Sequence, residues 1–337
     1  MTEAMTGRDK LAAVVDDIFA RNVIWDGHSG FLPNPAADLN ELSRWRDAGV
    51  NYLSIDVGFD LLDWHDTLRN IAAFRSWIAA NSDRFVMVES VHQIQRAKAE
   101  GKLAITFDVE GANALDGRLE MVGVYHRLGV RQMVLAYNVN NLAAGGCHDE
   151  DMGLTPFGAQ VVDEMNRLGM FVDLSHCAYR TTMDVMERSG QPVVFSHSNP
   201  RRLVDHDRNI RDDQIRACAA TGGLVGVVGL EIFMGRDASS QTYCDHICYL
   251  ADMIGPEHVG FTLDHSFAVD APGADEMFEQ NPQFWPLAQY AGRRHGQVLP
   301  AQLREVTSIL LQRGMARRDV EAILGGNFMR LAGQIWR

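Results

Sequence analysis

The 337-residue sequence predicts an α/β protein with a (β/α)8 barrel. Eight short apolar runs alternate along the chain with amphipathic segments of helical periodicity. Most of these runs are continuously apolar, as expected of parallel strands that are covered on both faces. No Ser- or Pro-rich linker and no internal repeat divides the sequence, so we expect one barrel domain spanning residues 1–337.

The predicted strands follow one another in chain order. They are Val23–Asp26, Tyr52–Val57, Leu103–Val109, Gln132–Ala136, Met170–Leu174, Pro192–Phe195, Leu224–Val228 and His258–Leu263. The clearest helical patterns between them are Leu61–Ala80, Phe157–Leu168, Arg180–Arg188 and Asp212–Ala220. A ninth apolar run, Phe85–Val88, is either a short edge strand or an extra piece before the third barrel strand.

Composition and charge argue against several functions. Asp and Glu (44) outnumber Lys and Arg (31), so the formal net charge is −13 and no basic surface for nucleic acid is expected. The N-terminal segment lacks the apolar stretch of a secretory signal, and the longest apolar run, residues 222–230, is too short to span a bilayer. The five cysteines form no CxxC pair, which indicates reduced thiols. We therefore expect a cytoplasmic protein that acts on a small molecule and binds neither nucleic acid nor membrane.

The ends of the predicted strands are rich in chemically active side chains. In a (β/α)8 barrel, catalysis takes place at the carboxyl ends of the strands. Seven of the eight runs end at a residue of this kind, and these residues are His28, Asp56, Glu110, Tyr137, His176, His197 and Asp264. Imidazole together with carboxylate suits Zn²⁺ or a similar transition ion, so the sequence predicts a metal centre.

Individual roles follow from the surrounding residues. Glu110 is predicted to be a ligand, because a carboxylate inside a barrel must be paired or bind a metal; a salt bridge in the barrel floor is the alternative. His176 and His197 both follow a serine after an apolar run and are predicted to be ligands. Asp173 is expected to fix a ligand imidazole. Asp264 is expected to accept a proton from metal-activated water, with a capping role in a strand-to-helix turn as the alternative.

Three further residues are predicted to bind the substrate. Arg208 lies in an Asp- and Asn-rich loop after the sixth strand, where a guanidinium can clamp a substrate carboxylate through two parallel hydrogen bonds. Its alternative role is an ion pair with Asp205 or Asp207. Tyr137 and Asn138, at the end of the fourth strand, could donate hydrogen bonds to a substrate carbonyl or oxyanion.

Taken together, these residues resemble the membrane (renal) dipeptidase family of the amidohydrolase superfamily. The similarity covers the chain from Asp26 to about Gly333. It is carried by DVEGA, LTPFGAQVVDEMNRLGMFVDLSH, PVVFSHSNPRRLVDHDRNIRDDQI, HVGF and ILGGNFMRLAG. The family is a (β/α)8 barrel with two zinc ions bridged by a glutamate. It cleaves dipeptides with a free C-terminal carboxylate and often tolerates a D-residue at that end.

The resemblance implies a role for each matching position. Glu110 corresponds to the bridging ligand, and His176 and His197 correspond to the ligands of one ion. His28 corresponds to a ligand of the other ion. By the same resemblance, Asp264 is the catalytic acid and base, and Arg208 binds the substrate carboxylate.

Two positions depart from the family pattern. The family's His-x-Asp motif reads His28-Ser29-Gly30 here, so the ion held by His28 loses a carboxylate ligand. We therefore expect one tightly bound Zn²⁺ and a weakened second site, unless Asp108 or Asp56 replaces the missing group. The family's substrate-contacting histidine at the end of the fourth strand is Tyr137 in this chain, which indicates a shifted substrate range.

The predicted function is a zinc-dependent dipeptidase-like hydrolase that uses metal-activated water. One alternative is a one-metal amidohydrolase acting on an N-acyl amino acid or a lactone. Another is a non-catalytic binding protein on the same scaffold. The aromatic-rich segment Phe278–Tyr290 is expected either to cover the barrel mouth or to form an interface, such as that of a homodimer.

Overall fold

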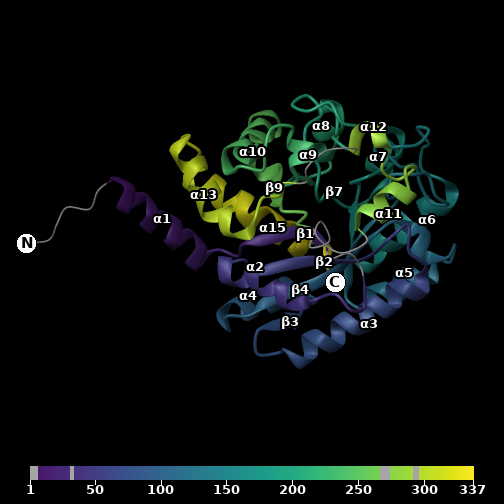
Figure 1. Ribbon diagram of the computed structural model, residues 1–337, viewed down its shortest axis with the longest axis horizontal. Helices are drawn as coiled ribbons and strands as arrows, with labels where there is room; N and C mark the ends of the chain where they lie inside the picture. Colours follow the sequence, from purple (N-terminus) through teal and green to yellow (C-terminus); the bar gives the residue numbers. More distant parts are fainter. Residues whose placement is uncertain (1–6, 31–33, 266–273, 291–295) are drawn as a thin grey trace, which may run out of the picture.

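Eight parallel strands form a nearly closed barrel that is surrounded by helices (Figure 1). The computed structural model describes residues 7–30, 34–265, 274–290 and 296–337. The barrel strands are β1 (Trp25–Gly30), β2 (Tyr52–Phe59), β4 (Leu103–Glu110), β5 (Val130–Val134), β6 (Phe171–Asp173), β7 (Val194–Phe195), β8 (Leu224–Val228) and β9 (Val259–Thr262). They pair in chain order, and the Asp264 amide beyond β9 donates to the carbonyl of His28 at 3.1 Å. The predicted (β/α)8 barrel is confirmed.

The helices lie between and around the strands. They are α1 (Gly7–Arg21), α2 (Ser43–Ala48), α3 (Trp64–Ala80), α4 (Val91–Ala99), α5 (Glu120–Arg127), α6 (Pro156–Leu168), α7 (Tyr179–Arg188), α8 (Asp212–Ala220), α9 (Glu231–Met234), α10 (Ser240–Ile254), α11 (Ala274–Gln280), α12 (Leu287–Tyr290), α13 (Leu303–Gln312), α14 (Arg317–Glu321) and α15 (Asn327–Ile335). Helix α6 shows the local rules: Thr155 caps its start, Pro156 is its first residue, and Gly169 ends it at φ 79°. In the described part of the chain, no helix has both the length and the apolar character needed to cross a membrane.

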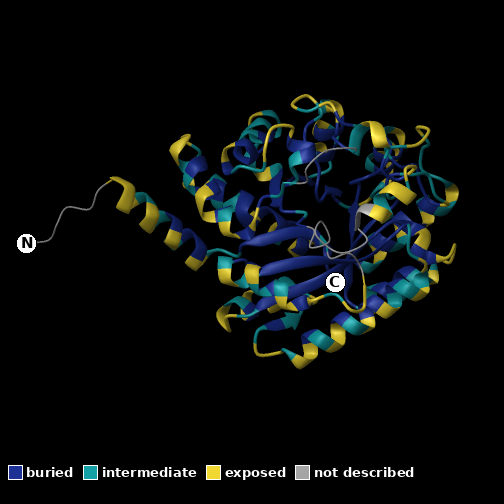
Figure 2. Ribbon diagram, in the orientation of Figure 1, coloured by how far each residue is buried: buried dark blue, intermediate teal, exposed yellow. Residues whose placement is uncertain are grey.

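A second, smaller core fills the amino end of the barrel. Trp25 and Tyr52, the first residues of β1 and β2, stack with ring centroids 3.6 Å apart. Phe328 from α15 stacks on Trp25 at 5.5 Å. The barrel strands themselves are buried, as Figure 2 shows. Aromatic rings therefore close the amino end of the barrel, opposite the carboxyl end at which active sites of this fold lie.

The structure corrects the bounds of two predicted strands and decides between the two alternatives for the ninth apolar run. Strand β1 was expected to stop at Asp26, but it continues through Gly30 with an irregular register between Asp26 and Ser29. The carboxylate of Asp26 accepts hydrogen bonds from Leu263 N and Trp45 Nε1, which ties this strand to its surroundings. Strand β5 lies at Val130–Val134, two residues earlier than expected. The ninth run forms β3 (Phe85–Met87), which pairs with β4 outside the barrel order and is therefore an edge strand.

Candidate metal centre

Four predicted ligands converge at the carboxyl ends of β1, β4, β6 and β7. The Nε2 atoms of His176 and His197 lie 2.9 Å apart, and they are 3.0 and 3.1 Å from Oε1 of Glu110. His28 Nε2 lies 3.7 Å from the same oxygen. All four side chains are buried. The structure thus brings residues separated by up to 169 positions in sequence to one point, with their donor atoms facing each other.

Hydrogen bonds orient two of the imidazole rings. His28 Nδ1 lies 2.9 Å from Asp108 Oδ1, and His176 Nδ1 lies 2.6 Å from Asn138 Oδ1. A carboxylate oxygen and an amide oxygen only accept hydrogen bonds, so Nδ1 is the protonated nitrogen of both rings. Their Nε2 atoms are therefore left as the atoms that can bind a metal, which is the usual arrangement around metal-binding histidines.

The third ring is held by a serine and an aspartate. Ser196 Oγ lies 2.6 Å from His197 Nδ1 and donates its own proton to Asp173. Asp173 also accepts hydrogen bonds from the amides of Ser175 and Ser196, both at 3.0 Å. Because Ser196 uses its proton on Asp173, it accepts the Nδ1 proton of His197. Asp173 thus acts on the imidazole through Ser196.

The donor set fits a divalent metal ion. Glu110 Oε1 is buried and accepts no hydrogen bond from the residues that the structure describes, although three imidazole nitrogens surround it. Burial lowers the pKa of His176 and of His197 well below the usual range, which keeps both rings neutral as metal ligands require. Two histidines, one glutamate and an open position form a ligand set that suits zinc.

The carboxylates around His28 carry more negative charge than the ring alone offsets. Burial lowers the pKa of His28, but the charges of Asp108 and Glu110 oppose this effect and hold that pKa well above its usual value. Burial also raises the pKa of Glu110 well above its usual range. The raised pKa values of His28 and Glu110 both indicate that the site favours added positive charge, which either a proton or a metal ion can supply.

Unusual backbone conformations aim three side chains at the centre. Among the described residues, four non-glycine residues have positive φ, and three of them are Asn138 (62°), His176 (65°) and Asp264 (48°). The left-handed region is sparsely populated for such residues, and its use often marks a functional site. Asp264 Oδ1 lies 3.5 Å from His28 Nε2, so the predicted proton acceptor is beside the predicted ligands.

Arg208 is buried beside the centre and forms no ion pair with an acidic residue in the described part of the chain. Its guanidinium donates to the carbonyl of His197 at 2.8 Å and to Ser198 Oγ at 3.1 Å. Its Nε is buried and has no hydrogen-bond partner within the described part of the chain. The alternative ion pair with Asp205 or Asp207 is not formed, because both carboxylates pair with Arg201 instead.

Tyr137 and Asn138, the two predicted substrate-binding residues after β5, have different surroundings. Tyr137 stacks on His176, with ring centroids 4.2 Å apart, and its amide donates to Asp60 Oδ2 at 2.9 Å. Burial, reinforced by the charge of Glu110, raises the pKa of the Tyr137 phenol well above its usual value, so the group remains a proton donor. The amide of Asn138 is used within the protein: its oxygen faces His176 Nδ1 and its nitrogen donates to the carbonyl of Phe284. This geometry favours positioning of His176 over the substrate contact that we predicted for Asn138.

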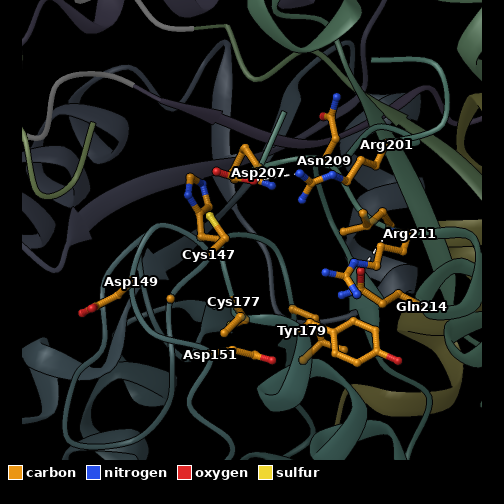
Figure 3. A pocket seen from close by; sticks show the side chains of 16 residues that line it. Cys147, Asp149, Asp151, Cys177, Tyr179, Arg201, Asp207, Asn209, Arg211 and Gln214 are labelled. Carbon is orange, nitrogen blue, oxygen red and sulfur yellow. Dashed lines mark hydrogen bonds and ion pairs between the residues drawn. The ribbon is translucent and has the colours of Figure 1, made fainter. Parts of the chain in front are cut away.

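A pocket of ≈ 170 Å³ lies beside His176 and Arg208. The segments that follow β5, β6 and β7, together with the starts of α7 and α8, supply its walls, which include Cys147, Tyr179 and Asp207 (Figure 3). A polar pocket that reaches both a predicted metal ligand and the Arg208 guanidinium can hold the carboxylate-bearing part of a small ligand.

The aromatic segment after β9 packs over the strand ends. Phe284 and Trp285 are buried against Phe59 and Tyr137. Tyr290 Oη lies 2.9 Å from His148 Nε2 in the long loop after β5. Of the two roles considered for this segment, its contacts within the chain favour covering of the barrel mouth. The homodimer stays a prediction.

Sequence reasoning missed the hydrogen-bonding roles of Ser196 and Asn138. The sequence contains the Ser-His pair twice, but its two serines have different roles. Ser196 bonds to the ring of His197, whereas Ser175 accepts a hydrogen bond from the His197 amide and the ring of His176 bonds to Asn138. Asp108 was considered as a metal ligand, but in the structure its carboxylate accepts the hydrogen bond from Nδ1 of His28. These roles depend on which strand ends lie side by side.

Replacement of Ser196 by alanine is expected to weaken zinc binding by about 10- to 100-fold, because His197 loses the acceptor that fixes its ring. Competition with a chromophoric chelator measures the affinity. Ser189→Ala, at the end of α7 and away from the centre, is the matched control. Unchanged zinc affinity in the Ser196 variant would contradict the assigned role.

The fold and the centre together define a (β/α)8 barrel of the amidohydrolase type. Residues 34–277 match the family model of the membrane dipeptidases, Peptidase family M19, and the chain belongs to this family. The predicted resemblance is thereby confirmed.

Individual relatives agree with this membership. An uncharacterized dipeptidase of Schizosaccharomyces pombe is 33% identical over 69% of this chain and 58% of its own length. The dipeptidase tcpJ of Claviceps purpurea is 30% identical over 80% of this chain and 60% of its own length. The chain thus spans about three fifths of these two curated relatives. The crystal structure of an amidohydrolase from Pseudomonas aeruginosa superposes with a TM-score of 0.87 at 29% identity, covering 96% of this chain and 99% of the other.

Proposed function

We propose that this chain is a zinc-dependent hydrolase that cleaves the amide bond of a dipeptide, including dipeptides with a C-terminal D-residue. The observation that carries the proposal is the convergence of His176 Nε2 and His197 Nε2 on the unpartnered Oε1 of Glu110. Membership of the membrane dipeptidase family supports the same reaction.

The residues around the centre would divide the work of amide hydrolysis. A zinc ion held by Glu110, His176 and His197 would supply a Lewis acid and lower the pKa of a water molecule. Asp264, whose carboxylate is only partly buried, would accept the proton of the attacking water and pass it to the leaving amine. Tyr137 keeps its phenol proton and would donate it as a hydrogen bond to the oxygen of the scissile carbonyl.

Arg208 would hold the terminal carboxylate of the substrate. Among the described residues, the buried Arg208 guanidinium has no charge partner and its Nε makes no hydrogen bond, and a substrate carboxylate would supply both. This contact would fix the distance between the carboxylate and the scissile bond, so it selects dipeptides over longer peptides. The pocket of ≈ 170 Å³ next to it offers the space.

Replacement of Arg208 by lysine is expected to raise KM for a dipeptide by about 10- to 100-fold, because lysine keeps the charge but loses the planar fork. Dipeptide amides, which lack the carboxylate, should show little change. Arg201→Lys is the matched control, since Arg201 lines the same pocket but is paired with two aspartates. Equal losses on dipeptides and their amides would contradict the carboxylate contact.

The decisive experiment measures metal content and turnover on one sample. Protein purified without added metal is analysed for zinc and assayed on L,L- and L,D-dipeptides, an N-acetyl amino acid and a lactone. We expect bound zinc and hydrolysis of dipeptides. Turnover confined to the acyl amino acid or the lactone would assign the alternative amidohydrolase reaction. No turnover with zinc restored would leave a binding protein on this scaffold.

A further inference from the structure

We propose that Tyr290, on helix α12 over the barrel mouth, binds the substrate by donating a hydrogen bond from its phenol to the terminal carboxylate that Arg208 holds. The inference rests on the proposed function, because it adds a second donor to the carboxylate contact assigned there to Arg208. It also gives the aromatic segment after β9 a role beyond covering the mouth.

The side chain of Tyr290 contacts two sides of the barrel mouth. Its ring packs against an apolar cluster after β8 that includes Phe233. Its hydroxyl lies 2.9 Å from His148 Nε2, in the loop after β5. The strands between β5 and β8 are β6 and β7, which lead into His176 and Arg208. Tyr290 therefore lies on the same part of the mouth as these two residues.

Two contacts tie α12 to the loop that carries Arg208. The amide of Arg208 donates to His206 Nδ1 at 3.1 Å, and the ring of His206 lies edge-on to that of Tyr290, with centroids 5.3 Å apart. Gln289, the neighbour of Tyr290, accepts a hydrogen bond from the Asp207 amide at 3.3 Å and donates one to the Asp207 carboxylate. Because residues next to Tyr290 and Arg208 in sequence are also joined in space, these contacts fix the position of Tyr290 relative to Arg208.

The surroundings of the Tyr290 hydroxyl suit a bound carboxylate. The Arg208 guanidinium carbon lies 5.7 Å from the ring centroid of Phe233, in the cluster on which Tyr290 packs. The charges of Arg208 and Asp264 both act on the Tyr290 hydroxyl. The side chain is only half-buried, so a small molecule can reach it. A phenol in this position complements a carboxylate that is paired with Arg208, because a carboxylate accepts several hydrogen bonds.

The hydrogen bond to His148 leaves the phenol proton of Tyr290 available. Burial lowers the pKa of His148 to about 4, so at neutral pH the ring carries one proton. His148 Nδ1 is buried without a hydrogen-bond partner among the described residues, whereas Nε2 faces Tyr290 Oη. Buried donors without a partner are rarer than such acceptors, so we assign the proton to Nε2, which donates it to Tyr290. Burial also raises the pKa of Tyr290 well above its usual value, so the phenol keeps its own proton for a ligand.

The test compares the kinetics of dipeptides with those of dipeptide amides, which lack the carboxylate. Tyr290→Phe keeps the ring contacts and removes only the hydroxyl. We expect KM for a dipeptide to rise about 10-fold, as for the loss of one hydrogen bond to a charged group, with kcat within about 2-fold of wild type. KM for the amide and the zinc content should stay unchanged, because the hydroxyl contacts neither the amide group nor the predicted ligands.

Two further variants separate the carboxylate contact from general effects. His148→Phe should raise KM for the dipeptide by less than Tyr290→Phe does. It should add nothing to Tyr290→Phe in the double variant, because His148 acts through the hydroxyl. Tyr179→Phe is the matched control, since Tyr179 lines the pocket beside Arg208 but donates its hydroxyl to Asp213 at 2.8 Å. The control should keep the wild-type KM for dipeptides and amides.

Three results would overturn the proposal. They are an unchanged KM for dipeptides in Tyr290→Phe, equal rises of KM for dipeptides and their amides, and the same rise in Tyr179→Phe. Any of these results in a protein whose wild type hydrolyses dipeptides would overturn only this inference. Absence of dipeptide hydrolysis by the wild type with zinc restored would overturn the proposed function and this inference together.

Discussion

Replacing Glu110 with glutamine is expected to remove zinc from the centre and to lower kcat/KM by at least about 10³-fold. The isosteric amide keeps the shape of the side chain but removes the negative charge that three imidazole nitrogens share. Loss of a group one layer outside the ligands typically weakens metal binding by about 10- to 100-fold, and loss of a direct ligand should exceed that range. Without the ion, both the Lewis acid and the activated water are lost.

Elemental analysis and chelator competition measure the zinc, and dipeptide hydrolysis measures kcat/KM. Glu100→Gln is the matched control, because Glu100 is an exposed carboxylate just before β4 and pairs with Arg96 and Lys102. The control should keep its zinc and its activity. A Glu110 variant with full zinc content would mean that Glu110 forms a salt bridge in the barrel floor, the alternative that the sequence left open.

Replacing Asp264 with asparagine is expected to lower kcat by about 10²- to 10⁴-fold with the tightly bound zinc retained. The carboxylate lies 3.5 Å from His28 Nε2 and is 17% exposed, so it lies beside the centre and remains partly accessible to solvent. Asparagine fits the same left-handed backbone at φ 48°, which keeps the geometry while removing the proton acceptor. General acid–base catalysis contributes rate factors of about this size.

The metal content separates this role from ligation. If Asp264→Asn loses zinc together with its activity, Asp264 binds the metal instead of moving a proton. Asp252→Asn, an exposed aspartate on α10, should change neither quantity. A variant that keeps full activity would remove Asp264 from the mechanism.

The sequence by itself determined the barrel and the main residues of the centre. Continuous apolar runs such as Leu224–Val228 identify buried parallel strands, because both faces of such strands are covered. The alternation of runs and helices then indicates a (β/α)8 barrel, in which catalytic residues lie at the carboxyl ends of the strands. Glu110, His176 and His197 could be selected for this reason before any contact was known. The cytoplasmic location remains a prediction.

Local patterns failed where the chain departs from regular geometry. Strand β1 was expected to end at Asp26, yet the strand continues through Gly30 past an irregular register. Gly27 lies against the ring of Phe328, where a Cβ atom would come within 2.7 Å of that ring. A side chain at position 27 would therefore clash with α15, which lies far away in the sequence, so the residues around Gly27 do not predict this constraint.

Only the tertiary structure decided how the polar residues divide their roles. The sequence treated Asp56 and Asp108 as equal substitutes for the missing ligand. The structure places Asp108 against His28 Nδ1, whereas Asp56 accepts a hydrogen bond from the Gly58 amide. The alternation of side chains along a strand shows which residues point into the barrel. Which inward residues meet depends on register and hydrogen-bond direction, and these are set by strands that lie far apart in the sequence.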